Sequence, residues 1–194
     1  MAEKATKPTR TMLAAIGEIA AESARVEDLM RELFSALIDS PYGAVITAGE
    51  DLSRVCQLCA RVAQYNVALS DHQITKLAAL INAIDAVRPH RNFFVHSRWE
   101  YVPSTRTHVG VRSSRPSQRA NGADLNEVAY TSPPDALKIA EHLRTIADSI
   151  EPFIAEAFPE WTRQRLMRRT SWKRMHELFG TLLRDFPPGL GLDS

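Results

Sequence analysis

Side chains able to transfer protons and to bind phosphate stand together in one segment, Arg91-Asn92-Phe93-Phe94-Val95-His96. Histidine suits proton transfer because its ordinary pKa, about 6.5, lies near the working pH. Arginine keeps its charge and grips phosphate oxygens with two parallel hydrogen bonds. On a helix, Asn92 and His96 share a face, whereas Arg91 lies about 140° round from His96. The segment is therefore a candidate site for acid–base chemistry on a phosphate ester.

The apolar residues inside this segment, Phe93 to Val95, are expected to anchor it in a core or to contribute to an interface between chains. A purely structural interpretation stands beside the chemical one. His96 is then a hydrogen-bonded packing residue at a helix end, and Arg91 is a surface ion-pair partner. Matches to motifs this short mislead readily, so the rest of the chain has to support the chemical interpretation.

Apolar residues at helical spacing predict four main helices, which begin near Pro8-Thr9, Glu50-Asp51, Ser70 and Pro133-Pro134. Because proline lacks a backbone N–H, Pro89 is expected to kink or restart the third helix just before the motif. The pattern then changes to that of short strands and loops. Strands are expected at 99–103 and 107–111, a third strand at 125–130, and a mobile loop at 113–122.

These elements predict an all-α fold, an antiparallel bundle of about four main helices with a small β-hairpin insertion and an extra basic C-terminal helical segment. The expected boundaries are 5–158 for the bundle, with the β insertion at about 99–130, then 159–186 for the basic extension and 187–194 for a tail.

The charge pattern points to a local polyanion site. The formal net charge is only +1, yet five arginines face a single acid between Ser97 and Gly122, and the stretch 161–176 carries six bases and no acid. Two basic regions on a near-neutral chain fit a local site better than a basic coat over the whole surface. The alternative for 161–176 is a solvated amphipathic helix that packs on the bundle.

Several classes of site and location are disfavoured. No apolar run approaches the roughly 20 residues that span a bilayer, and the N-terminus lacks a signal-peptide core, so a cytoplasmic location without membrane partners is expected. Cys56 and Cys59 are expected to be buried apolar residues rather than a metal pair. No metal or cofactor is expected. The remaining histidines lack metal-ligand spacing and are expected on the surface: His72, His108, His142 and His176.

The order arginine, polar residue, three spacers, histidine resembles the RNxxxH signature of the HEPN superfamily (higher eukaryotes and prokaryotes nucleotide-binding). The resemblance covers about 5–158 and extends to the helix order, with the motif near the end of the third main helix. It implies that Arg91 and His96 are catalytic and that Asn92 supports them. An acidic residue on the first helix often orients the arginine in such proteins. Glu27 is the first candidate for that role and Asp28 the second.

Many HEPN proteins are metal-independent RNases that act as dimers. The resemblance therefore implies an endoribonuclease that leaves 2′,3′-cyclic phosphate and 5′-hydroxyl ends, with two motifs paired in a homodimer. A toxin or phage-defence setting is implied, with RNA as substrate and an antitoxin or regulatory protein as a candidate partner. Other HEPN proteins have lost activity, so the alternative is a non-catalytic helical module that dimerises or binds RNA or protein. The residues expected to bind RNA are Arg88, His90, Arg98, Arg112 and Arg115.

Overall fold

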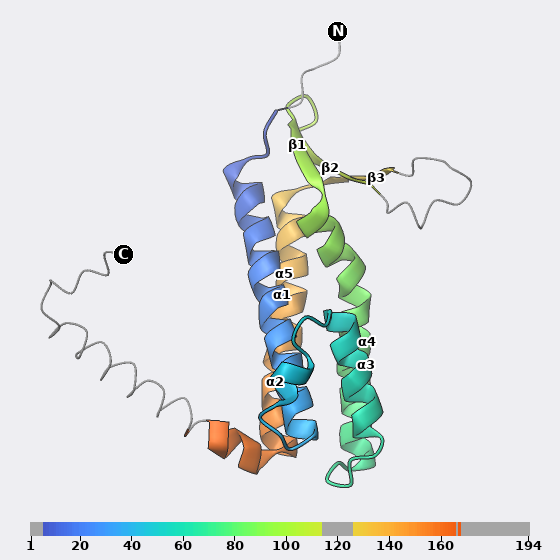
Figure 1. Ribbon diagram of the computed structural model, residues 1–194. Coiled ribbons are helices and arrows are strands. Elements are labelled where there is room, and N and C mark those ends of the chain that lie inside the picture. The colour runs from blue at the N-terminus through green and yellow to red at the C-terminus, as the bar shows by residue number, and fades with distance from the viewer. Residues whose placement is uncertain (1–5, 114–125, 166, 168–194) are drawn as a thin grey trace, which may run out of the picture.

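The computed structural model describes residues 6–113, 126–165 and 167. The elements in chain order are α1 (Arg10–Leu37), α2 (Gly43–Ile46), α3 (Leu52–Ala63), α4 (Asp71–His96), β1 (Arg98–Val102), β2 (Thr107–Ser113), β3 (Asn126–Thr131) and α5 (Pro133–Ala157). A further helical stretch, 159–165, follows α5. Figure 1 shows the main helices α1, α3, α4 and α5 packed side by side, with the sheet at one end. The fold is predominantly helical with a small sheet, as the sequence predicts.

Side-chain caps fix where three of the helices begin. Thr9 and Asp51 each accept a hydrogen bond from a backbone amide in the first turn, of α1 and of α3 respectively. Ser70 and Gln73 form a reciprocal capping box at the start of α4. Such caps satisfy amides that have no partner inside the helix. The predicted starts of these three helices are confirmed.

Helix α4 runs unbroken through Pro89, from Asp71 to His96. The expected restart of the helix before the motif is therefore wrong. Proline leaves the carbonyl of Asp85 without its helical partner. Pro89 lies on the exposed side of α4, where water can hydrogen-bond to that carbonyl, and the buried ring of Phe93 holds the next turn against the core.

Ion pairs show that α1 and α5 run in the same direction. Residue numbers rise together along the two helices, as they do for parallel neighbours. The pairs are Glu18–Arg144 at 3.6 Å, Arg25–Asp148 at 2.7 Å and, just beyond α5, Glu32–Arg165 at 2.6 Å. The expected antiparallel bundle is therefore wrong for this pair of helices, which Figure 1 shows side by side.

The connection between α1 and α3 explains this departure. It contains the one-turn helix α2 and returns along α1, so that the Arg31 guanidinium donates to the Glu50 carbonyl over 3.1 Å. Helix α3 then repeats the direction of α1, and α4 alone runs the opposite way. The contacts that show these directions are Cys59 Sγ to the Met30 carbonyl, Asn66 Nδ2 to the Leu37 carbonyl, and Lys76 Nζ to Glu156.

The sheet is fixed to the last turns of α4. Its order is β1-β2-β3 with antiparallel neighbours, so the third strand extends the expected hairpin. The Trp99 ring stacks on Phe94 with centroids 5.3 Å apart and meets Phe93 edge-on at 5.6 Å. Trp99 also donates from its indole N–H to the Phe94 carbonyl. Gly110 on β2 is the residue paired with Trp99 on β1. Phe93 and Phe94 are therefore buried within their own chain, and the expectation that they contribute to an interface is wrong.

His108, expected on the surface, is buried and only 2% exposed. It lies on β2 on the same face of the sheet as Gly110, because residues two apart in a strand share a face. Its Nε2 accepts from the Thr9 amide at 3.3 Å and lies 3.0 Å from the Thr9 hydroxyl. Thr6 pairs with Tyr101 on the neighbouring strand. Residues 6–9 are thus tied to the sheet. Burial lowers the pKa of His108.

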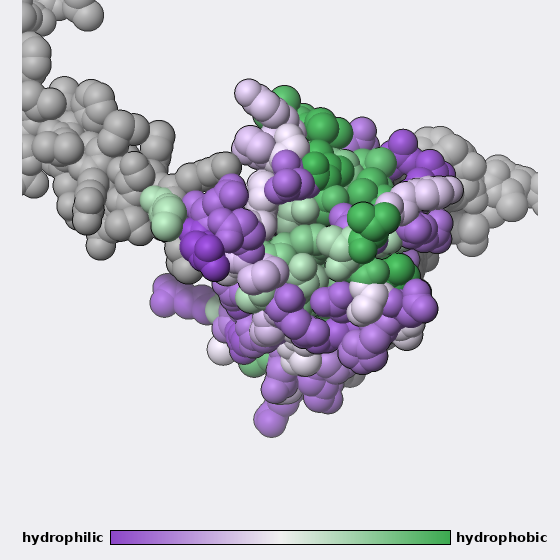
Figure 2. All heavy atoms as spheres, turned by 90° about the horizontal axis from the view of Figure 1, so that it is seen from below, coloured by the Kyte–Doolittle hydropathy of each residue, from purple (hydrophilic) through white to green (hydrophobic). Residues whose placement is uncertain are grey.

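Exposed apolar side chains gather at the end of the bundle away from the sheet (Figure 2). They come from α2 and from the turn between α3 and α4, and include Val45, Ile46 and Val67. Tyr65 lies in the same turn and is 85% exposed. This apolar end lies away from the motif, which is attached to the sheet.

The predicted apolar stripes otherwise form one core between the helices. Cys56 and Cys59 belong to it, which confirms their expected burial. Within the described ranges, no helix combines the length and the hydropathy needed to cross a bilayer. The expected loop at 113–122, with Arg115, and most of the basic extension at 159–186 lie outside the described residues.

Candidate functional site

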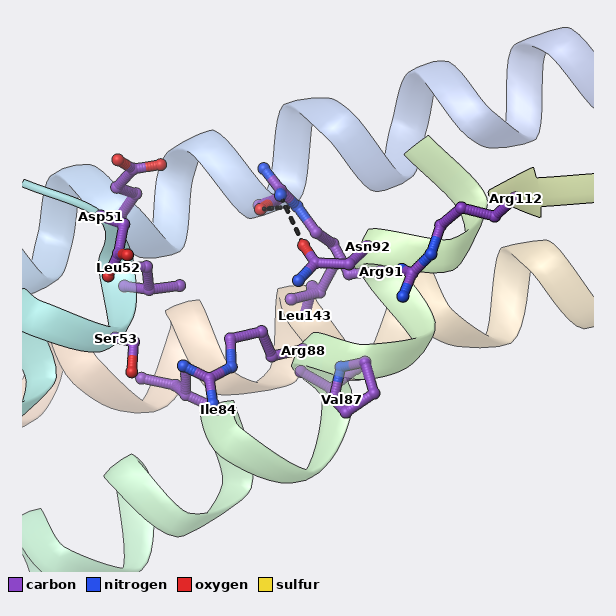
Figure 3. A pocket seen from close by; sticks show the side chains of 13 residues that line it. Asp51, Leu52, Ser53, Ile84, Val87, Arg88, Arg91, Asn92, Arg112 and Leu143 are labelled. Atoms are coloured by element: carbon purple, nitrogen blue, oxygen red, sulfur yellow. Dashed lines mark hydrogen bonds between the residues drawn. The ribbon is translucent and has the colours of Figure 1, made fainter. Parts of the chain in front are cut away.

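Arg91 and Asn92 line an open cavity of about 460 Å³ whose walls come from α1, the start of α3, α4, the end of β2 and α5. Its volume falls in the usual range for small-ligand sites. One part of the wall is apolar and is formed by Leu52, Ile84, Val87, Pro89 and Leu143. The polar wall, drawn in Figure 3, consists of Ser23, Glu27, Asp51, Ser53, Arg88, Arg91, Asn92 and Arg112. Three guanidinium groups from two elements therefore meet at one cavity.

The Arg91 guanidinium is held in place from two sides. Its Nε donates to the hydroxyl of Ser23 on α1, and its Nη1 donates to the side-chain oxygen of Asn92, both over 2.8 Å. Ser23 is only 2% exposed, so its hydroxyl depends on protein partners. Two hydrogen bonds fix the plane of the guanidinium and leave its other N–H groups available for a ligand. The expected support of Arg91 by Asn92 thus has a geometric basis.

Glu27 does not hold Arg91 in the way the sequence predicts. It lines the same cavity, but its carboxylate pairs with Arg31, one turn further along α1. Residues four apart on a helix face each other, which favours this local pair. Asp28, the second candidate, is 82% exposed at its side chain and lies 3.9 Å from Arg31. The residue on α1 that orients Arg91 is Ser23, one turn before Glu27, and nothing in the sequence singled it out.

His96 lies outside this cavity. It is the last residue of α4, its side chain is exposed, and it does not belong to the cavity lining, whereas Asn92, one turn earlier, does. Arg91 faces α1, and five helical positions place His96 about 140° away from it. A single copy of the chain therefore brings Arg91 and Asn92 together without His96.

The expected RNA-binding residues divide into two groups. Arg88 and Arg112 line the cavity, and Arg88 also pairs with Asp85 at 3.4 Å. Arg98 is 78% exposed at its side chain and pairs with Glu100 at 2.7 Å, and His90 is exposed. Neither Arg98 nor His90 lines the cavity. Arg115 lies outside the described residues.

The start of α3 adds a helix N-terminus to the wall of the cavity. Asp51 caps this helix by accepting from the Arg54 amide, and Leu52 and Ser53 follow it along the wall. The unpaired amides at a helix N-terminus carry partial positive charge, which favours an anion nearby. Among the described residues, no group of three or more histidines, cysteines or carboxylates is placed to hold a metal ion. The cavity therefore offers hydrogen-bond donors and positive charge together with the carboxylates of Glu27 and Asp51.

No protein-family model, curated protein or solved structure matches this chain. The resemblance to HEPN proteins therefore rests on the motif at Arg91–His96 and on the order of the predicted helices.

Proposed function

We propose that the chain binds RNA at the Arg91 cavity and is a metal-independent endoribonuclease of the HEPN type. The observation that carries the proposal is the fixed guanidinium of Arg91 in a cavity shared with Arg88 and Arg112. A guanidinium binds the oxygens of a phosphodiester in pairs and neutralises its charge. Arg88 and Arg112 come from α4 and β2, so positive charge reaches the cavity from two elements.

The chemistry follows from what RNA brings to the site. Its 2′-hydroxyl is a nucleophile that DNA lacks. A base takes the proton of this hydroxyl, the 2′-oxygen attacks the phosphorus, and an acid protonates the departing 5′-oxygen. The products are a 2′,3′-cyclic phosphate and a 5′-hydroxyl. In this proposal His96 transfers protons and Arg91 stabilises the charge of the phosphorane.

The position of His96 makes a homodimer part of the proposal. Because His96 is exposed outside the cavity of its own chain, a second copy has to bring a histidine to the substrate held by Arg91. The paired arrangement also supplies both an acid and a base. A toxin or phage-defence setting, with an antitoxin or regulatory protein as partner, belongs to the same proposal and follows from the resemblance to HEPN proteins.

A non-catalytic RNA-binding module is the second candidate. The separation of His96 from the cavity favours it, since a binding site needs only the arginines and the donors around them. In that case RNA binds at the cavity with the same dependence on Arg91 and without cleavage.

The deciding assay incubates the purified chain with mixed RNA in EDTA. We expect cleavage by the wild type and losses of about 10²–10⁴-fold in Arg91→Ala and in His96→Ala. His72→Ala is the matched control, because His72 is exposed on the first turn of the same helix, far from the cavity. RNA with a 2′-deoxy linkage should resist, and mass spectrometry should find the cyclic phosphate.

The outcomes separate the two candidates. Binding that Arg91→Ala weakens, without cleavage by the wild type, establishes the non-catalytic module. Cleavage that survives His96→Ala, or that needs a metal ion, contradicts the enzyme mechanism. Light scattering at micromolar concentration tests the dimer, since an active monomer would refute the paired site.

A further inference from the structure

The Arg91 cavity is chemically polarised along its length. Ser23 holds Arg91, and one turn further along α1 Glu27 lies at the end where α3 begins. Arg31 marks this end, because it binds both the Glu27 carboxylate and the carbonyl of Glu50, next to Asp51. Figure 3 shows Asp51 and Arg112 at opposite ends, with Arg91 and Asn92 between them. Carboxylates thus lie at one end of the cavity and Arg112 lies at the other, while the Arg88 guanidinium, which pairs with Asp85, lies on the Ser53 side of Arg91.

The two carboxylates retain hydrogen-bonding capacity. Oε1 of Glu27 accepts from Arg31, and Oδ1 of Asp51 accepts from the Arg54 amide. Among the described residues no hydrogen bond engages the other oxygen of either carboxylate. An ionised carboxylate only accepts hydrogen bonds. A ligand that fills the cavity therefore needs N–H or O–H donors at the end opposite its phosphate.

We propose that the cavity takes one nucleotide with its phosphate at Arg91 and Arg112 and a guanine base at Glu27 and Asp51. This inference rests on the phosphate binding assumed in the proposed function. Guanine carries two adjacent donors, N1–H and the 2-amino group, on one edge. Uracil carries a single N–H between two carbonyl oxygens, which the carboxylates repel. The apolar wall at Ile84, Val87 and Leu143 suits the faces of the base and the ribose.

The volume of the cavity agrees with a ligand of one nucleotide. About 460 Å³ accommodates one nucleotide and excludes a stacked run of bases. The described residues that line the cavity include no aromatic ring, so this part of the wall provides no platform on which bases stack. The carboxylates of the lining can instead hydrogen-bond to the edge of a base. The pattern of donors and acceptors on that edge distinguishes one base from another.

Titration calorimetry on the full chain tests the proposal with four probes: 5′-GMP, 5′-IMP, 5′-UMP and inorganic phosphate. IMP differs from GMP only by lacking the 2-amino group. We expect GMP to bind about tenfold more tightly than IMP and UMP. Asp51→Asn and Glu27→Gln should bring the three nucleotides to similar affinities. Asparagine also caps helices well, so the first variant keeps the start of α3.

Two control variants accompany these measurements. Glu50→Gln changes an exposed acid next to Asp51 whose side chain does not line the cavity, and it should leave the order of affinities unchanged. Arg91→Ala should weaken all four probes together, because it removes the contact to phosphate. Thermal unfolding of each variant identifies any that fails to fold.

The possible binding results test the base preference, the role of the two carboxylates and the anion cavity separately. Equal binding of GMP, IMP and UMP to the wild type overturns the base preference and leaves phosphate binding intact. A preference for GMP that persists in both Asp51→Asn and Glu27→Gln overturns the assignment to these carboxylates. Failure of all four probes to bind, with the fold intact, overturns the anion cavity and with it the basis of the proposed function.

Discussion

The Nε of Arg91 on α4 donates a hydrogen bond to the Ser23 hydroxyl on α1 over 2.8 Å. This bond joins two residues that are 68 positions apart in the chain and lie on different helices. Ser23 is buried, so its position is set by the packing of the whole bundle. The guanidinium is thereby oriented before any ligand arrives, which lowers the cost of ordering it on binding.

Ser23→Ala should weaken phosphate and RNA binding by about tenfold, because Arg91 then has to be ordered by the ligand. The measurement is the affinity for RNA, with urea unfolding to check the fold. Ser35→Ala is the matched control. Ser35 is also buried on α1, but its hydroxyl donates to the Arg31 carbonyl within the same helix. Equal losses of affinity in the two variants would show that Ser23 has no positioning role.

Gly110→Ala should destabilise the attachment of the sheet to α4. A Cβ at this position would lie 2.6 Å from the Trp99 ring and 3.0 Å from Phe93, and forced repacking costs about 1–3 kcal/mol. Urea unfolding measures this change, and an unchanged free energy of unfolding in Gly110→Ala would show that Trp99 and Phe93 repack at little cost.

Gly17→Ala should instead stabilise the fold. Gly17 lies exposed within α1, and a Cβ there meets nothing within 4 Å. The substitution should raise the free energy of unfolding by about 0.5–1 kcal/mol, which urea unfolding also measures.

The local features of this fold could be predicted from the sequence. The starts of three helices, near Thr9, Asp51 and Ser70, were predicted because the signal for a helix start lies within the residues of its first turn. The short strands at 99–103 and 107–111 were predicted from their change of period and agree closely with β1 and β2. The motif also lies on a helix, as its spacing indicates.

Features that depend on distant residues could not be predicted. The direction of α3 follows from the path of the segment 38–51, whose only regular element is a single turn. Ser23 carries no signal of its own in the sequence, because a serine in an amphipathic helix looks like any small residue. Glu27 was expected to orient Arg91 because of the resemblance to HEPN proteins, but its carboxylate pairs with Arg31, four residues away on the same helix.

Cys56 and Cys59 should resist thiol reagents in the folded protein. Burial raises the pKa of Cys56 to about 12 and also raises that of Cys59, and only the thiolate is a good nucleophile. A disulfide-exchange reagent at pH 8 should therefore react slowly in buffer and with both thiols in urea. Rapid labelling without denaturant would mean that α3 opens locally, since both side chains are buried against the core.

Folding stability should fall in mildly acidic solution because of His108. Burial lowers the pKa of His108 in the folded chain, whereas the unfolded chain binds the proton near its ordinary pKa of about 6.5. Below that pH the unfolded state holds more protons than the folded state, so the free energy of unfolding decreases as pH falls. Above it, this group contributes no pH dependence. Urea unfolding between pH 5 and 7.5 measures the slope, which His108→Gln should reduce. His142→Gln, on the exposed face of α5, should keep the wild-type slope, and equal slopes in all three proteins would show that His108 titrates freely in the folded chain.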